Sequence, residues 1–256
     1  MDQETTSLPR RVLVTGSAGA IGRVVAPALS QRGHFVRGYD LADSHGVDES
    51  HTGNLVDAGS VEMAIDGMDT ILHLAAEPNE ADFLTRLLEP NVIGLYNVFA
   101  GATKLGVKRI IIASSCQVVL NLETGGKPIR LEDGVAPPNH YALTKLWAEG
   151  MGEMYSRLYG MEVIAVRIGG FPRDRKGVER ILSFNRQGLI LSHDDAVRFF
   201  TCGIEVETLP TPFVILPAAS KWPAAPFFDL EPARRIIGYE PQDIFPEGIP
   251  FLKELE

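Results

Sequence analysis

A glycine-rich segment constrains the fold of this 256-residue chain more than any other feature. The segment "VLVTGSAGAIGR" places Gly16, Gly19 and Gly22 between an apolar strand-like run and a helical run. In that position the first glycine allows a tight turn, the second lets the backbone approach a pyrophosphate, and the third lets the helix pack against the strand. The N-terminus of the helix then offers free N–H groups to phosphates. The segment predicts a dinucleotide-binding loop, and the alternative is a glycine-rich turn without a ligand.

Short β-rich runs alternate with longer helical runs along the chain. Strands are expected at 11–16, 34–40, 69–76, 108–115, 161–170 and 212–218, and helices at about 20–32, 61–68, 81–105, 140–159 and 231–238. Gly33, Gly106 and Gly160 stand where three of these helices should end. Alternation of apolar strands with helices predicts an α/β fold, a doubly wound parallel sheet of the Rossmann type covered by helices on both faces.

The same pattern divides the chain into three parts. We expect a flexible tail over 1–10, a nucleotide-binding core over 11–170, and a small substrate-covering region over 171–256 that packs on the core as one structural unit. Near the start of an expected helix in the last part, Ser192 and Asp195 have the spacing of a capping box, with Asp in the place of Glu or Gln.

Charge and cysteine content narrow the class of protein. A formal net charge of -9 argues against binding to nucleic acid or to an anionic membrane, because phosphates would be repelled. Only Cys116 and Cys202 occur, so no disulfide framework is implied, and the N-terminus has no apolar signal core. No apolar run reaches transmembrane length, and the six histidines lack metal-ligand spacing. We expect a cytoplasmic protein without a metal.

Asp40 ends the second expected strand, 18 residues after Gly22. A carboxylate at this position accepts hydrogen bonds from the adenosine ribose hydroxyls and repels a 2′-phosphate. The following residues, "LADSH", contain no arginine, so NAD is favoured over NADP. The alternative is an aspartate that only forms a turn, and Arg37 is a nearby cation whose direction the sequence leaves open.

The segment "YALTKLWAE" places Tyr141 and Lys145 one helical turn apart. Tyrosine is a poor base at its ordinary pKa of about 10, and an adjacent ammonium favours the phenolate. The strand-end serines Ser114 and Ser115 of "IIIASSC" offer a hydroxyl to orient a substrate oxygen. These residues predict proton transfer by Tyr141 with an apparent pKa well below that of free tyrosine. The alternative is a solvated surface pair.

Several segments in order carry a resemblance to a known family. The glycine spacing, "HLAA" at 73–76, "NVIGLYN" at 91–97, the strand-end serines and Tyr141-x-x-x-Lys145 resemble the extended short-chain dehydrogenase/reductase superfamily over roughly residues 11–240. "NVIGLYNVF", "YALTKLWAE", "VRIG" and "SHDD" are most similar to its uronate dehydrogenase-like branch.

The resemblance implies a set of site residues. The catalytic residues would be Ser115, Tyr141 and Lys145, with Ser114 as the alternative serine. The residues implied to contact the cofactor are Gly16, Gly19, Ala20, Ile21, Gly22, Asp40, Asn54, Leu55, His73, Leu74, Ala75, Ala76, Asn91, Tyr141, Lys145, Ile168 and Gly169. The residues implied to contact the substrate are Ser115, Cys116, Gln117, Tyr141, Gly170 and Arg180. Alternatively, "HLAA" is only a buried strand end and Asn91 a polar group between helices.

This chain departs from the branch at substrate positions. Cys116 and Gln117 stand where uronate dehydrogenases have Asn-His, and Gly170 replaces a serine. We interpret Cys116 as a pocket-wall residue rather than a nucleophile, because no histidine is near it in sequence. The net positive segment at 171–180, with Arg173, Arg175, Lys176 and Arg180, fits either an anion clamp or a solvated loop.

The leading hypothesis is an NAD-dependent dehydrogenase that oxidises a sugar-type hydroxyl, such as the anomeric carbon of a uronate or aldose to a lactone. The alternatives are a nucleotide-sugar epimerase or dehydratase with tightly bound NAD, and a non-catalytic NAD sensor, which would not need the Ser/Tyr/Lys set. The resemblance also implies a homodimer through the helices at 81–105 and 140–159, although the apolar stripe Met151, Met154, Tyr155 and Leu158 is more typical of a core.

Overall fold

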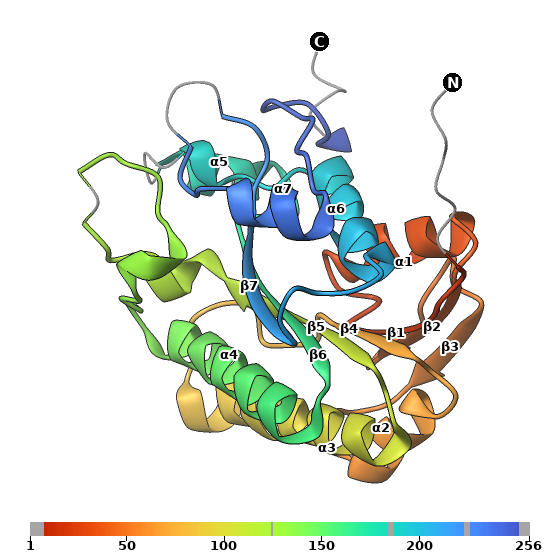
Figure 1. Cartoon of the computed structure of the whole chain (residues 1–256). Helices are drawn as coiled ribbons and strands as arrows, with labels where there is room; N and C mark the ends of the chain where they lie inside the picture. The colour runs from red at the N-terminus through yellow and green to blue at the C-terminus, as the bar shows by residue number, and fades with distance from the viewer. Residues whose placement is uncertain (1–7, 124, 184–186, 223–225, 251–256) are drawn as a thin grey trace.

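A computed structural model describes residues 8–123, 125–183, 187–222 and 226–250. Within these residues a seven-stranded sheet has the order β3-β2-β1-β4-β5-β6-β7, and every neighbouring pair is parallel. The strands are β1 (Arg11–Thr15), β2 (Phe35–Asp40), β3 (Glu49–Thr52), β4 (Thr70–His73), β5 (Arg109–Ser115), β6 (Glu162–Ile168) and β7 (Phe213–Ala218). The predicted doubly wound α/β fold is confirmed (Figure 1).

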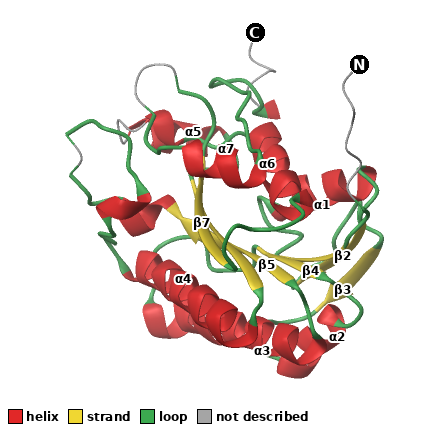
Figure 2. Ribbon diagram, in the orientation of Figure 1, coloured by secondary structure: helices red, strands yellow, loops and turns green. Residues whose placement is uncertain are grey.

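Helices cover both faces of the sheet (Figure 2). The α-helices are α1 (Gly22–Gln31), α2 (Ala58–Ile65), α3 (Leu95–Leu105), α4 (His140–Tyr159), α5 (Arg175–Ser183), α6 (His193–Glu205) and α7 (Glu231–Ile237). A π-helix, η1 (Phe83–Gly94), precedes α3, and η2 (Cys116–Val119), η3 (Leu131–Asp133) and η4 (Gln187–Leu189) are short 3₁₀ helices. None of the described helices combines the length and apolarity needed to cross a bilayer.

Each face of the sheet carries its own hydrophobic core. Side chains alternate along a strand, so Val12 and Val14 of β1 pack with α1 and α6, whereas Leu13 packs with α2 and α3. In β5, Ile111 faces the first core, and its neighbours Ile110 and Ile112 face the second. Burial on both faces explains why the strands read as continuous apolar runs.

The predicted helix-ending glycines are confirmed. Gly106 and Gly160, with φ angles of 73° and 68°, are the C-caps of α3 and α4, and Gly33, with a φ of 96°, follows Arg32, the C-cap of α1. This left-handed conformation is open to glycine without steric cost, and it terminates each helix before the next strand.

Three parts of the chain differ from the prediction. β3 was not expected, because "ESHT" is polar; it joins the sheet edge through backbone bonds to β2 and through the ion pair between Glu49 and Arg37. The stretch 81–105 is not one regular helix: its first part is the π-helix η1, which contains Pro90, a residue that cannot donate to the helical ladder. Residues 175–183 form the helix α5 rather than the loop that one interpretation of 171–180 proposed, although Arg175, Lys176 and Arg180 are exposed to solvent as that interpretation expected.

The region 171–256 contributes directly to the main fold. β7 extends the sheet beside β6, α6 packs against α1, and α7 packs on β7. Of the expected tail over 1–10, residues 1–7 lie outside the described residues.

The N-terminus of α6 differs in detail from the predicted capping box. Ser192 is the N-cap, and its hydroxyl accepts a hydrogen bond from the N–H of Asp195 at 3.0 Å. The Asp195 carboxylate does not return the bond; the N–H of Ser192 instead donates to the hydroxyl of Ser220. The Asp195 carboxylate instead accepts hydrogen bonds from the N–H groups of Gln242 and Asp243, which follow α7 in the chain.

Candidate active site

A cavity of about 540 Å³ lies where the strand order reverses, between β1 and β4. Loops after the carboxyl ends of parallel strands meet at such a point and leave a crevice for a ligand. The residues that line it are Gly16, Gly19, Ala20, Ile21, Gly22, Tyr39, Asp40, Leu41, Gly53, Asn54, Leu55, Leu74, Ala75, Ala76, Glu77, Pro78, Thr85, Arg86, Glu89, Pro90 and Arg173.

The glycine loop forms one wall of this cavity, and its geometry accepts no side chains. Gly16 has a φ of 72°, and a Cβ atom there would lie 2.6 Å from the backbone nitrogen of Ala75. A Cβ at Gly22 would overlap the carbonyl oxygen of Gly16. No side chain caps the start of α1, and the N–H groups of Arg23 and Val24 bond to the backbone carbonyls of Gly19 and Ile21 at 3.0 and 3.1 Å. This cradle fits a pyrophosphate group.

Asp40 lies on the cavity wall at the end of β2. Its carboxylate accepts hydrogen bonds from the N–H groups of Ala18 at 3.0 Å and Leu41 at 2.7 Å, which ties it to the glycine loop. Arg37 is directed elsewhere: its Nε lies 2.7 Å from Glu49 Oε2, and its guanidinium also donates to the carbonyl of Ala64. The nearby cation that the sequence left open is therefore held away from Asp40.

The residues expected at the cofactor fall into two groups. The eleven from the glycine loop, Asp40, Asn54, Leu55 and Leu74 to Ala76 all line the cavity, whereas the other six do not: His73, Asn91, Tyr141, Lys145, Ile168 and Gly169. The Asn91 side-chain oxygen accepts a hydrogen bond from the N–H of Glu77 at 2.8 Å. Its amide nitrogen donates to the carbonyl of Glu77 at 3.1 Å and to the hydroxyl of Thr144 at 3.0 Å. Asn91 thus holds the loop after β4 against α4.

Sequence reasoning missed several lining residues. Tyr39, Leu41, Gly53, Glu77 and Pro78 adjoin segments that the motifs had identified. Thr85, Arg86, Glu89 and Pro90 come from η1, whose approach to the cavity depends on packing and carries no sequence signal.

Ser115 and Tyr141 are brought together at the carboxyl end of β5. A hydrogen bond with Ser115 lowers the pKa of Tyr141, while burial of the phenol raises it by more. Ser114 lies on the other side of the strand, where its hydroxyl donates to Glu149 at 2.6 Å. The geometry therefore favours Ser115 over Ser114 as the partner of the tyrosine.

Lys145 is buried one turn beyond Tyr141 on α4. Its Nζ lies 5.5 Å from the centroid of the Tyr141 ring, and burial lowers the pKa of the lysine to about 8. Burial, together with the charge of Lys145, lowers the pKa of the neighbouring His73 to about 3, so this imidazole is neutral. His73 Nδ1 lies 2.8 Å from the Thr15 hydroxyl.

The ionisation of Tyr141 differs from the sequence expectation. Its pKa was expected to fall well below 10 because of Lys145, but in the structure the pKa is raised, and burial is the main cause. The neighbouring ammonium is itself desolvated, since Lys145 has a pKa lowered to about 8 by the same burial. The raised pKa favours the protonated phenol.

Comparison with known proteins identifies the family. The family model described as "NAD dependent epimerase/dehydratase family" matches residues 12–171, more than half of the chain. The chain belongs to this family. Uronate dehydrogenase from Pseudomonas syringae pv. tomato is 31% identical over 189 residues, covering 71% of this chain and 68% of the relative. L-arabinose 1-dehydrogenase (NAD(P)(+)) from Haloferax volcanii is 26% identical over 249 residues, covering 91% and 96%.

Solved structures agree with this assignment. A mutant of uronate dehydrogenase from Agrobacterium tumefaciens, complexed with NAD, is 29% identical, with a TM-score of 0.77 and coverage of 91% of this chain and 85% of that one. The resemblance to NAD-dependent dehydrogenases of the extended short-chain type is confirmed.

Cys116, Gln117 and Gly170, which the resemblance implied as substrate contacts, have local contacts of their own. Cys116 is buried in a small apolar cluster with Val118 and Val119, and Gln117 accepts a hydrogen bond from Asn139, the N-cap of α4, at 3.0 Å. A Cβ at Gly170 would lie 2.9 Å from the side chain of Ile181, so α5 occupies the space beside this glycine.

The basic segment contributes one residue to the cavity. Arg173 lines the wall, and its charge favours ionisation of Tyr141. Arg175, Lys176 and Arg180 are exposed on α5, and none of them is among the lining residues. Across the described ranges, no group of three or more His, Cys, Asp or Glu side chains is arranged to hold a metal ion.

Proposed function

We propose that this protein is an NAD-dependent dehydrogenase that oxidises a sugar-type hydroxyl, with a uronate or aldose as substrate and the anomeric carbon as the site of oxidation. The observation that carries the proposal is the contact between Ser115 and Tyr141 beside Lys145, at the sheet edge where the glycine loop and Asp40 line a cavity. Relatives named uronate dehydrogenase and L-arabinose 1-dehydrogenase support a sugar substrate.

Each catalytic residue has a defined task in this reaction. When bound, NAD supplies the acceptor for the hydride that leaves the substrate carbon. Tyr141, once ionised to the phenolate, accepts the hydroxyl proton as the C=O bond forms, and Ser115 donates a hydrogen bond that orients the substrate oxygen. Lys145 favours the phenolate electrostatically and would bond the nicotinamide ribose. The glycine loop would hold the pyrophosphate and Asp40 the adenosine ribose.

Arg173 supports an anionic substrate. It is the member of the basic segment that lines the cavity, and it is near enough to Tyr141 for its charge to lower the phenol pKa. A guanidinium forms paired hydrogen bonds with a carboxylate, as a uronate would present. We therefore rank sugar acids above neutral aldoses.

A substrate screen tests the proposed function. Purified protein is incubated with NAD and a panel of uronates, aldoses and sugar phosphates, and NADH is followed by absorbance. We expect NADH to accumulate with at least one sugar acid. A UDP-glucose 4-epimerase from Vibrio cholerae is also a relative, at 29% identity, and interconversion of nucleotide sugars without free NADH would favour that activity instead. Binding of NAD without turnover of any sugar would favour the sensor.

Asp40 gives a prediction about the cofactor. NAD should support turnover better than NADP, because the carboxylate accepts from the ribose hydroxyls and repels a 2′-phosphate. Asp40→Ala should narrow the ratio of the two kcat/KM values by about tenfold, since one charge-assisted hydrogen bond is lost. Asp43→Ala, an exposed carboxylate three residues on, is the matched control. A wild-type preference for NADP would contradict the assignment.

The exposed face of α3 and α4 gives a prediction about assembly. We propose a homodimer through these helices, because Tyr96, Leu143, Trp147, Leu158 and Tyr159 are all about half exposed on them. Of the apolar stripe on α4, Met151 and Tyr155 are buried in the core, and Leu158 is exposed where a second copy could contact it. Light scattering at micromolar concentration should report a dimer, and Trp147→Glu should convert it to a monomer. A monomeric wild type would contradict the proposal.

A further inference from the structure

A buried ion pair lies directly behind the proposed catalytic residues. Arg167 at the end of β6 donates to Glu149 of α4 from Nε at 2.9 Å and from NH2 at 3.0 Å. Both side chains are almost fully buried, with exposures of 4% and 5%. The Ser114 hydroxyl donates to the same carboxylate at 2.6 Å. The carboxylate of Glu149 thus receives three hydrogen bonds from two neighbouring strands.

The three residues adjoin the site in sequence and in space. Glu149 follows Lys145 by one helical turn and Tyr141 by two, so it lies on the same buried face of α4. Ser114 precedes Ser115 on β5 and is paired in register with Arg167 on β6. The network therefore joins the helix that carries Tyr141 and Lys145 to the strand end that carries Ser115.

The energetics of such a pair indicate a role in geometry. Apolar contacts hold α4 on the sheet through Ala148, Met151 and Tyr155, and these contacts have no strong directional preference. A buried ion pair adds little stability, since matched apolar side chains are often as stable or more so. A paired guanidinium–carboxylate contact is directional, however, and sets both the rotation and the position of the helix along the strand.

We propose that Glu149 and Arg167, with Ser114, are positioning residues that set the distance and orientation of Tyr141 relative to Ser115. This proposal rests on the proposed dehydrogenase function. Loss of the ion pair removes the directional contact between α4 and β6, and the phenol then loses its alignment with the hydroxyl of Ser115. Small misplacements of reacting groups reduce rates strongly while leaving distant binding contacts intact.

The chain contains a second ion pair at the other end of the same two strands that serves as a control, although its arginine, Arg109, also donates to backbone carbonyls at 203–207. Arg109 and Glu162 begin β5 and β6, are paired in register, and bond at 2.9 and 2.6 Å through the Arg109 Nε and NH2 atoms. Arg109 is 4% exposed and Glu162 is 29% exposed. This pair shares the strands of the first pair but lies at the opposite edge of the sheet from the carboxyl ends.

The test compares the two pairs as apolar double variants, Glu149→Met/Arg167→Met and Arg109→Met/Glu162→Met. Thermal unfolding is measured for each, together with NAD affinity and kcat and KM for the sugar acid, glucuronate first, that yields NADH. We expect the first variant to stay folded with NAD affinity and KM within about twofold of wild type, and its kcat to fall about tenfold or more. The control variant should keep kcat within about twofold, whatever its unfolding temperature.

A second variant tests the same role if the double variant Glu149→Met/Arg167→Met does not fold. Glu149→Gln keeps the side-chain shape and an oxygen acceptor for Ser114 but removes the charge that orients Arg167, and its kcat should fall about fivefold or more at temperatures where it is folded. A folded Glu149→Gln or double variant with kcat within twofold of wild type would overturn the positioning role. If Tyr141→Phe turned over as fast as wild type, the dehydrogenase mechanism itself would fail, which separates the two outcomes.

Discussion

Tyr141→Phe is expected to lower the rate of hydride transfer by ~10²-fold or more, because it removes the hydroxyl that takes the substrate proton. The ring is retained, so the buried packing of the side chain is kept and NAD should bind as in the wild type. Stopped-flow single-turnover measurement of NADH, together with NAD titration, separates these two effects.

Three other variants are compared with Tyr141→Phe: one is a control, and two remove the other proposed catalytic side chains. Tyr159→Phe removes the hydroxyl of an exposed tyrosine at the end of the same helix, and should leave both measurements unchanged. Ser115→Ala should lower the rate with little loss of NAD affinity, since its hydroxyl addresses the substrate oxygen. Lys145→Ala should reduce both, because it removes a charge beside the phenol and the group proposed to bond the nicotinamide ribose. Wild-type turnover by Tyr141→Phe would refute the proton-transfer role and leave "YALTKLWAE" as a packing helix.

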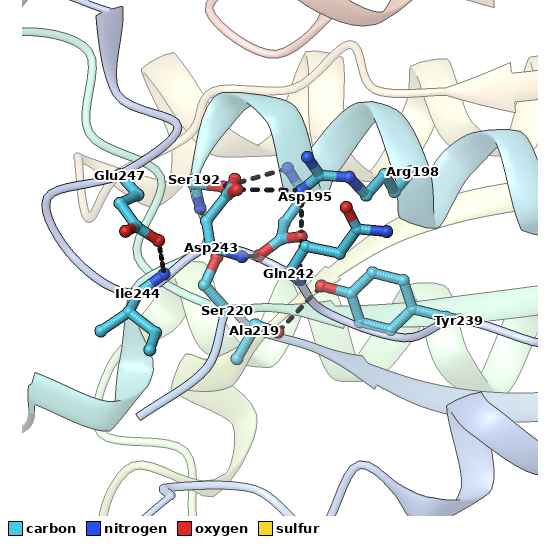
Figure 3. Close-up of polar contacts among 10 residues, drawn as sticks. All are labelled: Ser192, Asp195, Arg198, Ala219, Ser220, Tyr239, Gln242, Asp243, Ile244 and Glu247. Atoms are coloured by element: carbon cyan, nitrogen blue, oxygen red, sulfur yellow. Dashed lines mark hydrogen bonds and ion pairs between the residues drawn. The ribbon is translucent and has the colours of Figure 1, made fainter. Parts of the chain in front are cut away.

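Asp195→Ala should destabilise the protein by about 3 kcal/mol, because it removes one partner of a buried charge network. Asp195 is fully buried and lies 2.6 Å from Arg198 NH1. Its carboxylate also accepts from the N–H groups of Gln242 at 2.8 Å and Asp243 at 3.2 Å (Figure 3). Without it these two backbone donors lose their acceptors, and Asp243 becomes the remaining carboxylate beside Arg198 in this network.

The free energy of unfolding in urea measures the effect. Asp194→Ala is the matched control, since Asp194 is the adjacent residue but is exposed, and its loss should cost no more than about 0.5 kcal/mol. A second expectation follows from the contacts: Asp195→Ala should make the segment at 239–248 more accessible to protease, because the carboxylate is what fastens Gln242 and Asp243 to α6. Equal stability of the two variants would contradict the assigned role of the network.

The glycine loop, Asp40 and the Tyr141–Lys145 spacing were readable from sequence because each depends on neighbours within a few residues. A tight turn needs glycine at a given position, a helix places residues four apart on one face, and an apolar strand buried on both faces shows in its own composition. The order of strands and helices, and the glycines that end α1, α3 and α4, follow from the same local physics.

Contacts between distant segments were not readable in this way. Arg173 and the η1 residues reach the cavity only through packing, and β3 joins the sheet through backbone bonds that carry no apolar pattern. The choice between Ser114 and Ser115 also depended on a partner from elsewhere, since Glu149 holds Ser114. In the same way, Asp195 was interpreted as a cap but binds a segment more than forty residues away.

By itself, the sequence determined the α/β class, the dinucleotide loop and the residue types available for proton transfer, because backbone sterics and side-chain periodicity act over short distances. The tertiary structure alone decided that Ser114 is held by Glu149, which cation reaches the cavity, and how the phenol ionises. Burial raises the Tyr141 pKa, and it lowers that of Lys145 to about 8. Desolvation depends on everything packed around a group, and a one-dimensional pattern does not carry that information.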